Sequence, residues 1–314
     1  MKVATFNINN INKRLDNLLA WLAKAEPDVV SLQELKAEQG AFPVKALRSL
    51  GYEAVWLGER SWNGVAILAR NQVPVLTRTS LPGNPEGHYS ETRILHSETR
   101  NHQDRNHQDR NHQDRNHQDR NHQDRNHQDR NQEDRHHETR NQEDRQARYI
   151  EAAVQGVLIA SIYLPNGNPQ PGPKFNYKLA WFERLIAHAA ELMASGAPVV
   201  LAGDYNVVPT PQDIYPTRSL DHNALIQPES RQAFARLLAQ GWTDAMRKLH
   251  PDGPLWTFWD YKFERWQKDK GMRLDHFLLS PNLSDRLVDG GVDRWARGQE
   301  NASDHAPTWI VLDL

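Results

Sequence analysis

The stretch that decides the fold is Pro198-Val199-Val200-Leu201-Ala202-Gly203-Asp204-Tyr205-Asn206-Val207. Its apolar part, 198–202, has the length of a strand and no polar face, which is typical of a strand buried on both sides. Asp204 and Asn206 follow at once and share one face if the chain stays extended. A buried carboxylate costs free energy unless it is paired or binds a metal. The stretch therefore predicts a buried sheet with a polar site at its edge.

Strands and helices alternate on either side of this stretch. We expect strands at 3–8, 29–32, 52–57, 64–70, 149–154, 157–164, 273–280 and 307–312. Helical spacing of apolar residues predicts helices at 14–25, 44–50, 175–194 and 230–240. Because helices alternate with strands early and strands dominate later, we expect helices that cover a layered sheet core.

Composition excludes several classes of protein. The chain has 314 residues, no cysteine and a formal net charge of −2, which excludes a disulfide scaffold, a thiolate zinc site and a cysteine nucleophile. No apolar run approaches the roughly 18 residues of a membrane helix, and the N-terminus resembles a strand rather than a signal peptide. We expect a soluble, cytoplasmic protein. An enzyme of this charge that acts on nucleic acid needs a local basic patch.

A pentapeptide repeat interrupts the chain. Residues 96–145 contain no hydrophobic residue, and Asn-His-Gln-Asp-Arg occurs six times in succession from Asn101 to Arg130. A period of five fits neither helix nor strand, and a segment with nothing to bury cannot offset its ordering entropy. We therefore expect one catalytic domain, 1–92 with 148–314, and a disordered insertion at 93–147, most simply at a hairpin tip. A tolerated surface expansion, a histidine-rich metal tract and a weak nucleic-acid tether all stay open as interpretations of the repeat.

Polar residues stand at the ends of several predicted strands: Asn7, Glu34, Asp204, Asp275 and Asp304. Each position taken alone has a purely structural explanation, since Asp304 could be a turn residue and Glu34 a loop carboxylate. Because five such positions occur in one domain, a separate structural explanation for each of them is improbable. Carboxylate and amide oxygens without cysteine favour Mg²⁺ or Mn²⁺ over zinc. Magnesium commonly has phosphate as a further ligand, so the pattern points to phosphoryl chemistry.

Three segments resemble the signatures of the exodeoxyribonuclease III family of apurinic/apyrimidinic endonucleases. They are Pro27-Asp28-Val29-Val30-Ser31-Leu32-Gln33-Glu34-Leu35-Lys36, Trp256-Thr257-Phe258-Trp259 and Gly271-Met272-Arg273-Leu274-Asp275-His276-Phe277-Leu278-Leu279-Ser280. Segments 6–9, 61–68, 163–167 and 303–307 also fit the bacterial branch, in order. The resemblance covers 1–92 and 148–314. The sequence departs from the family pattern at Asn10, Ala245-Met246 and Asp269, none of them a catalytic position, and the repeat is foreign to it.

The resemblance implies a four-layer α/β sandwich, in which two packed, mostly antiparallel or mixed sheets are flanked by helices. It also implies Mg²⁺-dependent cleavage of DNA phosphodiesters, with Mn²⁺ as a possible substitute. By position, Glu34 would be the principal metal ligand, with Asn7 and Asp304 nearby.

The resemblance also implies roles in the reaction. Asp204 would orient or deprotonate the attacking water, and Asn206 would hold that water or the phosphate. His305, oriented by Asp275, would bind an oxygen of the scissile phosphate. Tyr163 would donate to the phosphate or assist the leaving group.

One basic segment is suited to DNA. Five bases, with two acids among them, lie within twelve residues: Lys262, Arg265, Lys268, Lys270 and Arg273. Neighbouring aromatic side chains could pack on a sugar or base, although Trp259 fits a core position equally well. By resemblance, Phe258, Met272 and Leu274 would line a pocket for a baseless sugar.

The sequence thus predicts a monomeric DNA repair nuclease with abasic-site endonuclease and 3′–5′ exonuclease or 3′-end-processing activity. Its partner would be double-stranded DNA with abasic sites or blocked 3′ ends, and no membrane. Two alternatives stay open. One is a phosphodiesterase or phosphatase of the same superfamily that acts on another phosphate ester, such as a phosphoinositide, sphingomyelin or an RNA tail. The other is a non-catalytic DNA-binding relative.

Overall fold

Two six-stranded sheets form the framework of the computed structural model, which describes residues 1–83, 146–217 and 222–314. The first sheet has the order β11-β12-β1-β2-β4-β3 and the second β5-β6-β7-β8-β10-β9. The strands of the first sheet are β1 (Lys2–Asn7), β2 (Val29–Gln33), β3 (Tyr52–Leu57), β4 (Val65–Arg70), β11 (Leu287–Val292) and β12 (Thr308–Leu312). Those of the second are β5 (Val75–Arg78), β6 (Tyr149–Val154), β7 (Val157–Tyr163), β8 (Val199–Asp204), β9 (Thr243–Asp244) and β10 (Asp275–Leu279).

The helices differ widely in length. They are α1 (Leu15–Ala25), α2 (Val44–Arg48), α4 (Pro173–Ala194), α5 (Pro228–Leu238), α6 (Ala245–Leu249), α7 (Pro281–Ser284) and α8 (Arg294–Arg297). Short 3₁₀ turns occur at Gln39–Ala41, Pro211–Asp213 and Lys262–Glu264. None of the helices in the described residues is both long and apolar enough to cross a membrane.

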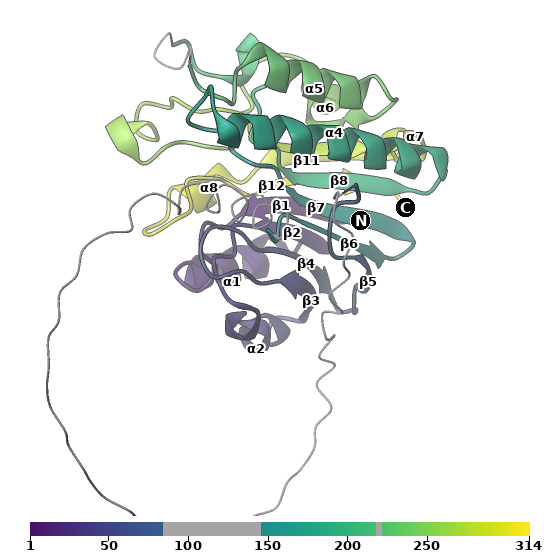
Figure 1. Ribbon diagram of the computed structural model, residues 1–314. Coiled ribbons are helices and arrows are strands. Elements are labelled where there is room, and N and C mark those ends of the chain that lie inside the picture. The colour runs from purple at the N-terminus through teal and green to yellow at the C-terminus, as the bar shows by residue number, and fades with distance from the viewer. Residues whose placement is uncertain (84–145, 218–221) are drawn as a thin grey trace, which may run out of the picture. The chain divides into compact units, whose positions relative to one another are not determined.

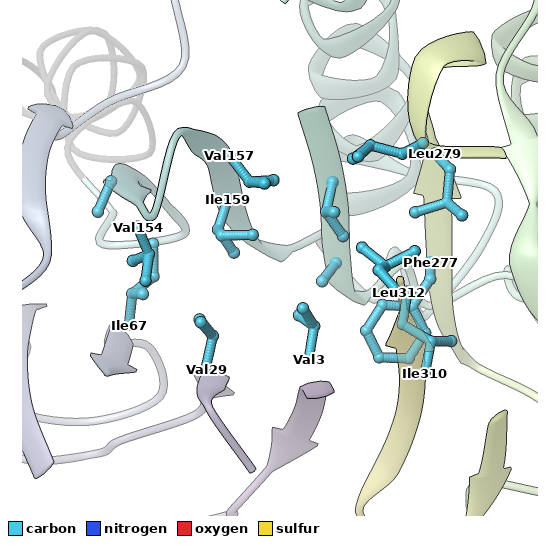
Figure 2. Close-up of a cluster of buried hydrophobic side chains, with 14 of the residues drawn as sticks. Val3, Val29, Ile67, Val154, Val157, Ile159, Phe277, Leu279, Ile310 and Leu312 are labelled. Carbon is cyan, nitrogen blue, oxygen red and sulfur yellow. The ribbon is translucent and has the colours of Figure 1, made fainter. Parts of the chain in front are cut away.

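The main core lies between the two sheets. Val3 and Val29 of the first sheet belong to the same buried cluster as Ile159 and Phe277 of the second, and Figure 2 shows these side chains between the sheets. Side chains alternate along a strand, so every second residue of the central strands reaches this layer. The apolar pattern of 198–202 follows from this arrangement, because β8 buries both of its faces.

Helices cover the outer face of each sheet (Figure 1). On the first sheet, Trp21 of α1 and Leu47 of α2 pack in one cluster with Phe6. On the second, Phe182 of α4 and Phe234 of α5 pack in another cluster. The resulting order of helices, sheet, sheet and helices confirms the predicted four-layer sandwich.

Each sheet contains one parallel pair at its centre, and this feature positions the site. β1 runs parallel to β2, and β7 runs parallel to β8, while the other neighbours are antiparallel. The parallel pairs face each other across the core, with β1 over β8 and β2 over β7. The carboxyl ends of four strands therefore meet at one edge of the sandwich.

The predicted strands and helices are all present, with ends that differ by a few residues. Strands β5, β9 and β11 and helices α6, α7 and α8 were not predicted. β5 pairs antiparallel with β6, so the nearest described strands on either side of the repeat are neighbours in one sheet. The predicted strand 64–70, which is β4, lies in the other sheet. The predicted insertion itself, apart from Gln146 and Ala147, lies outside the described residues, and its disorder stays a prediction.

Candidate active site

Because side chains alternate along a strand, polar side chains point into the space between the sheets at the edge where the strands end. In β1, Val3 enters the central core and Asn7 lies on the same face. In β7 and β8, Tyr163 and Asp204 are the last residues and are buried, and Asp275 begins β10 opposite Asp204. The buried layer therefore changes from apolar to polar toward this edge.

A buried hydrogen-bonded group lies between the sheets, next to the inward-facing polar residues. Gln33 donates to Ser31 at 2.7 Å and to Ser161 at 3.2 Å, and Thr5 donates to Gln33 at 3.3 Å. These contacts join β1 and β2 to β7, and a satisfied polar network fixes one arrangement of the strands. The site above it is thus held by both sheets.

Glu34 is the centre of the first half of the site. Its Oε1 accepts hydrogen bonds from Asn7 Nδ2 and from the Tyr163 hydroxyl, both at 2.9 Å, and its Oε2 lies 2.8 Å from Lys36 Nζ. Burial alone would raise the pKa of the Glu34 carboxyl, but the Lys36 ammonium and the Asn7 amide outweigh it and lower this pKa. The carboxylate is therefore held in its charged form.

The backbone at Glu34 is strained. Its φ of 53° lies in the left-handed region, which costs a non-glycine residue on the order of 1–3 kcal/mol. The Glu34 carbonyl accepts from Asn10 N at 2.8 Å, and Lys36 N donates to Asn63 O at 2.8 Å. These backbone contacts hold the chain at Glu34 in this conformation.

Asp304 joins this half of the site through Asn9. Asn9 Nδ2 donates to Asp304 Oδ1 at 3.0 Å, and Asn9 Oδ1 accepts from Lys36 Nζ at 2.6 Å. Because Lys36 also contacts Glu34, one chain of contacts connects Glu34 with Asp304. Ser303 ties the Asp304 loop to β1 by donating to Asn7 O at 2.6 Å.

Asp204 connects the two halves. Its Oδ2 accepts from Asn7 Nδ2 at 3.0 Å, and its Oδ1 accepts from the backbone N of Asn206 at 2.8 Å. An added Cβ at Gly203 would clash with the Ile162 carbonyl oxygen, so the close approach of β7 and β8 requires glycine before Asp204. Burial raises the pKa of the Asp204 carboxyl to about 7, although the His305 side chain lowers it.

His305 lies between two buried carboxylates. Its Nδ1 is 2.8 Å from Asp275 Oδ2, and its Nε2 is 3.8 Å from Asp204 Oδ2. Burial alone would lower the pKa of His305, but the Asp275 carboxylate outweighs it and raises this pKa to about 10. The imidazole is therefore protonated at neutral pH and presents Nε2 to the site.

A pocket of about 160 Å³ opens next to His305 and Asn206. Phe258 and Met272 belong to its apolar wall, and the charged residues of its lining are Lys270, Arg265 and Asp260. The Phe258 ring lies 4.9 Å from the His305 ring, and Asn166, which also lines the pocket, donates to Asn206 at 3.0 Å. Phe258 and Asn166 thus connect the pocket to His305 and Asn206, which do not line it themselves.

Four residues expected to contact DNA are buried, and one of them, Met272, which is 8% exposed, still lines the pocket. Arg273 is 1% exposed and is bound by Asp213 and Asp244, so its predicted DNA contact is wrong. Trp259 is fully buried and packs against Trp266, so the core interpretation holds for it. Leu274 is buried behind Met272 and does not line the pocket.

The other members of the basic segment lie on the surface. Lys262, Lys268 and Lys270 are exposed, and Arg265 is half-buried at the pocket, with its guanidinium 4.6 Å from the Tyr215 ring. Lys268 forms an ion pair with Glu264 at 2.7 Å, which reduces the charge that it offers to a ligand. Lys270 and Arg265 are therefore the bases best placed beside the pocket.

The donor set beside Glu34 suits a hard cation. Glu34 and Asp304 offer carboxylate oxygens, and the Lys36 ammonium between Glu34 and Asn9 occupies a place that favours positive charge. Within the described residues, no group of three or more His, Cys, Asp or Glu has the geometry of a metal site.

Sequence reasoning gave no role to three polar residues at the site, although Asn9 stands in the segment 6–9 that fits the family pattern. Lys36 and Asn9 lie two residues from Glu34 and Asn7, so the spacing offered a signal for both. Lys178 of α4 is fully buried and donates to Pro165 O at 3.0 Å and Asn206 O at 2.6 Å. Burial lowers its pKa to about 7. A single lysine in an amphipathic helix gives no such signal in the sequence.

Comparisons with known proteins agree with this architecture. Residues 4–305 match the model of the endonuclease/exonuclease/phosphatase family. Exodeoxyribonuclease III of Haemophilus influenzae is 27% identical over 320 residues, which cover 98% of each chain. The DNA repair nuclease APEX1 of Danio rerio is 26% identical and covers 99% of this chain and 82% of its own.

Solved structures match equally well. The 3′–5′ exonuclease NExo from Neisseria meningitidis superposes with a TM-score of 0.79 at 32% identity, and an AP endonuclease from Archaeoglobus fulgidus with 0.78 at 27%. Both alignments cover 100% of each chain.

Proposed function

Because the chain belongs to the endonuclease/exonuclease/phosphatase family, we propose that it is a DNA repair nuclease that hydrolyses phosphodiester bonds with the help of a divalent cation. Relatives named exodeoxyribonuclease III and AP endonuclease support the substrate class. So does a related 3′ phosphatase, NExo, whose structure contains a product DNA hairpin. The observation that carries the proposal is the contact of Asn7 with both Glu34 and Asp204, beside His305.

The proposed metal ligands are Glu34, with Asn7 and Asp304. When bound, Mg²⁺, or Mn²⁺ in its place, supplies positive charge that stabilises the phosphate and the leaving oxygen. Lys36 keeps the Glu34 carboxylate charged, and the Asn7 amide fixes the orientation of Oε1. Asn9 fixes the orientation of Asp304.

Asp204 is the proposed base for the attacking water. Its two oxygens are oriented by Asn7 and by the backbone of Asn206, and its position between Glu34 and His305 lets a water reach both the carboxylate and a phosphate. A base acts only within hydrogen-bond reach of the proton that it accepts. Asn206, fixed by its own bonds to Leu164 O and Asn166, would hold that water or a phosphate oxygen.

His305 and Tyr163 are the proposed donors. His305 presents Nε2–H to the site because Asp275 holds Nδ1, so it would bind a non-bridging oxygen of the phosphate. Tyr163 has its hydroxyl against Glu34 and its ring 4.5 Å from the Arg148 guanidinium. It would donate to the phosphate or to the leaving oxygen.

The pocket beside His305 supports the choice of damaged DNA. Its volume and its Phe258 and Met272 wall suit a sugar without a base, or the last residue of a 3′ end, turned out of the duplex. Lys270 and Arg265 would contact the adjacent phosphates. We therefore propose incision at abasic sites and processing of 3′ ends as the two activities. The expectations of a monomer and of a cytoplasmic location stay predictions.

A cleavage assay tests the proposal. Three substrates would be compared with Mg²⁺ present: a labelled duplex with one abasic analogue, the same duplex undamaged, and a soluble inositol phosphate. We expect cutting at the analogue and removal of residues from 3′ ends. Glu34→Gln should lose activity, whereas Glu229→Gln, the same change at an exposed position of α5, should retain it. Release of phosphate from the inositol phosphate with intact DNA left over would refute the proposal.

A further inference from the structure

Lys178 is a buried basic residue to which the proposed reaction gives no role. It lies in the second turn of α4, the helix that covers the outer face of the second sheet (Figure 1), and none of its surface is exposed. In the part of the chain that the structure describes, its ammonium contacts two carbonyl oxygens and forms no ion pair. Lysine is almost never fully buried without a charged partner, because burying the charge costs free energy. The position therefore indicates a task that an apolar side chain could not perform.

The ammonium joins two loops at the edge of the sheet where the site lies. Lys178 Nζ donates to Pro165 O at 3.0 Å, in the loop after β7, and to Asn206 O at 2.6 Å, in the loop after β8. β7 and β8 are the parallel pair whose last residues are Tyr163 and Asp204. Lys178 thus ties together the two loops that follow these residues.

Side chains of the same two loops complete a circuit of contacts around Asn206. Asn166 Nδ2 donates to Asn206 Oδ1 at 3.0 Å, and Asn206 Nδ2 donates to Leu164 O at 2.9 Å. With the two bonds of Lys178, these contacts fix both the backbone and the amide of Asn206. The φ of Asn206 is 46°, in the left-handed region, which asparagine adopts more readily than most residues but which still requires support. The bond from Lys178 to the Asn206 carbonyl supplies part of that support.

The loop after β7 is shaped around the stem of the lysine. Gly167 has a φ of 89°, and a Cβ at this position would lie 2.6 Å from Lys178 Cδ. Any larger residue would displace the stem or the loop, so the position requires glycine. Burial lowers the pKa of Lys178 to about 7, and the Asp204 carboxylate opposes part of this effect. The ammonium therefore also interacts electrostatically with the site.

We propose that Lys178 is a positioning residue, which fixes the loops after β7 and β8 so that the Asn206 amide meets the attacking water or the phosphate in one orientation. Because Lys178 has no exposed surface, it does not touch the substrate and acts through Asn206. A misplacement of about 1 Å at a reacting centre can cost about 100-fold in rate, and smaller shifts cost less. This inference rests on the proposed function and adds to it the residue that holds Asn206 in place.

A double-mutant cycle tests the inference. Steady-state cleavage of a duplex with one abasic analogue would be measured for wild type, Lys178→Met, Asn206→Ala and the double variant. Methionine keeps the unbranched stem of lysine and removes the charge and the donors. Lys178→Met should lower kcat about tenfold and leave KM within about twofold of wild type. The double variant should lose no more than Asn206→Ala alone, because Lys178 acts through that side chain, whereas a purely structural defect would add to the loss.

Two further variants separate positioning from stability. Lys45→Met, the same change at an exposed position of α2, should cut like wild type. Lys178→Gln keeps an N–H donor without the charge, so it should lose less kcat than Lys178→Met, and it repeats the cycle if methionine destabilises the fold. Circular dichroism and thermal denaturation show whether each variant is folded at the assay temperature.

Each result decides the matter in one direction. Losses of kcat in Lys178→Met and Asn206→Ala that do not add, in folded proteins with an unchanged KM, support the inference. Additive losses, wild-type activity in both Lys178 variants, or a raised KM at an unchanged kcat would overturn it. Failure of both Lys178 variants to fold would also overturn it, because the role of Lys178 would then be structural. If wild type leaves the abasic duplex uncut, the proposed function is refuted and the inference falls with it.

Discussion

Replacing Asp213 by asparagine should destabilise the fold while leaving the proposed chemistry in place. Asp213 is fully buried and accepts from Arg273 Nε at 2.7 Å, from Arg247 at 2.5 Å and from the Thr210 hydroxyl at 2.7 Å. Arg273 N also donates to Asp213 O, so this ion pair anchors the chain that carries Met272 of the pocket.

The size of the effect follows from these contacts. Removing one partner of a buried ion pair costs about 3–5 kcal/mol. Arg273 keeps Asp244 at 2.8 Å in the variant, so we expect the lower end, about 3 kcal/mol. For a protein of this size, 1 kcal/mol corresponds to roughly 2–4 °C in Tm. Asp213→Asn should therefore melt about 6–12 °C below wild type.

The pH dependence provides a second readout. Burial alone would raise the pKa of the Asp213 carboxyl, but the Arg273 and Arg247 guanidinium groups hold it well below its usual value. A lowered pKa stabilises the fold above the unfolded value of about 4, and this stabilisation is lost as the pH falls through the folded value. The difference in Tm should stay constant from pH 5 to 8 and narrow below pH 4.

Thermal denaturation and DNA binding together check this prediction. Asp285→Asn, at a side chain that is 96% exposed, is the matched control and should melt like wild type. A Tm of Asp213→Asn within 1–2 °C of wild type would refute the argument from the buried ion pair. Weaker DNA binding at an unchanged Tm would instead restore a direct DNA contact for Arg273.

Three other substitutions test parts of the site. Asp275→Asn should lower kcat about 5–10-fold, the difference between a charged and a neutral hydrogen bond to His305. As the pH rises, the variant should lose activity at a lower pH than wild type does, because the Asp275 carboxylate no longer raises the pKa of His305. An unchanged pH–rate profile from pH 6 to 9 would contradict this role of Asp275. Lys270→Glu should lower the slope of log K against log salt for DNA binding by about 1, and an unaltered slope would exclude it as a phosphate contact. Phe258→Ala should lower kcat/KM about tenfold on the abasic duplex and on 3′ ends, for roughly 1.5 kcal/mol of lost apolar contact; unchanged kcat/KM on both substrates would argue against a pocket that receives the displaced residue.

The sequence predicted the strands and helices that carry strong apolar patterns and missed those that do not. β11 contains Asp289, Gly290 and Gly291, which weaken a strand pattern. Packing favours a small residue there, since a Cβ at Gly291 would lie 3.0 Å from the Trp309 ring. β9 has only two residues, and β5 is partly exposed at the edge of its sheet. Neither strand is long enough to show a detectable alternation of apolar and polar residues.

Polar residues at strand ends were predictable because their position follows from a local rule. The inward face of each strand continues into Asn7, Asp204 and Asp275, and the packing of two parallel pairs brings these ends together. Tyr163, at the end of β7, was assigned only by resemblance. Lys36 was not predicted as part of the site. Its contact with Glu34 depends on the left-handed backbone of Glu34 and Lys36, with φ of 53° and 48°. No apolar pattern in the sequence reveals such a conformation.

Charge patterns were the least reliable guide. Arg273 stands in a basic run, and its partner Asp213 is 60 residues away in the 3₁₀ turn Pro211–Asp213, so only the fold shows that the two are paired. Arg14 and Arg297 illustrate the reverse case. They are 283 positions apart in the sequence and meet in one pocket without a carboxylate partner in the described structure.

The metal dependence of cleavage tests the central claim most directly. A labelled duplex with one abasic analogue would be incubated with wild type and Glu34→Gln while Mg²⁺ is titrated from zero in the presence of a chelator. We predict no cutting without the cation, saturable cutting by wild type as Mg²⁺ rises, and a loss of several kcal/mol of transition-state stabilisation in Glu34→Gln. Cutting by wild type in the chelator alone, or cutting by Glu34→Gln at the wild-type rate, would contradict the account.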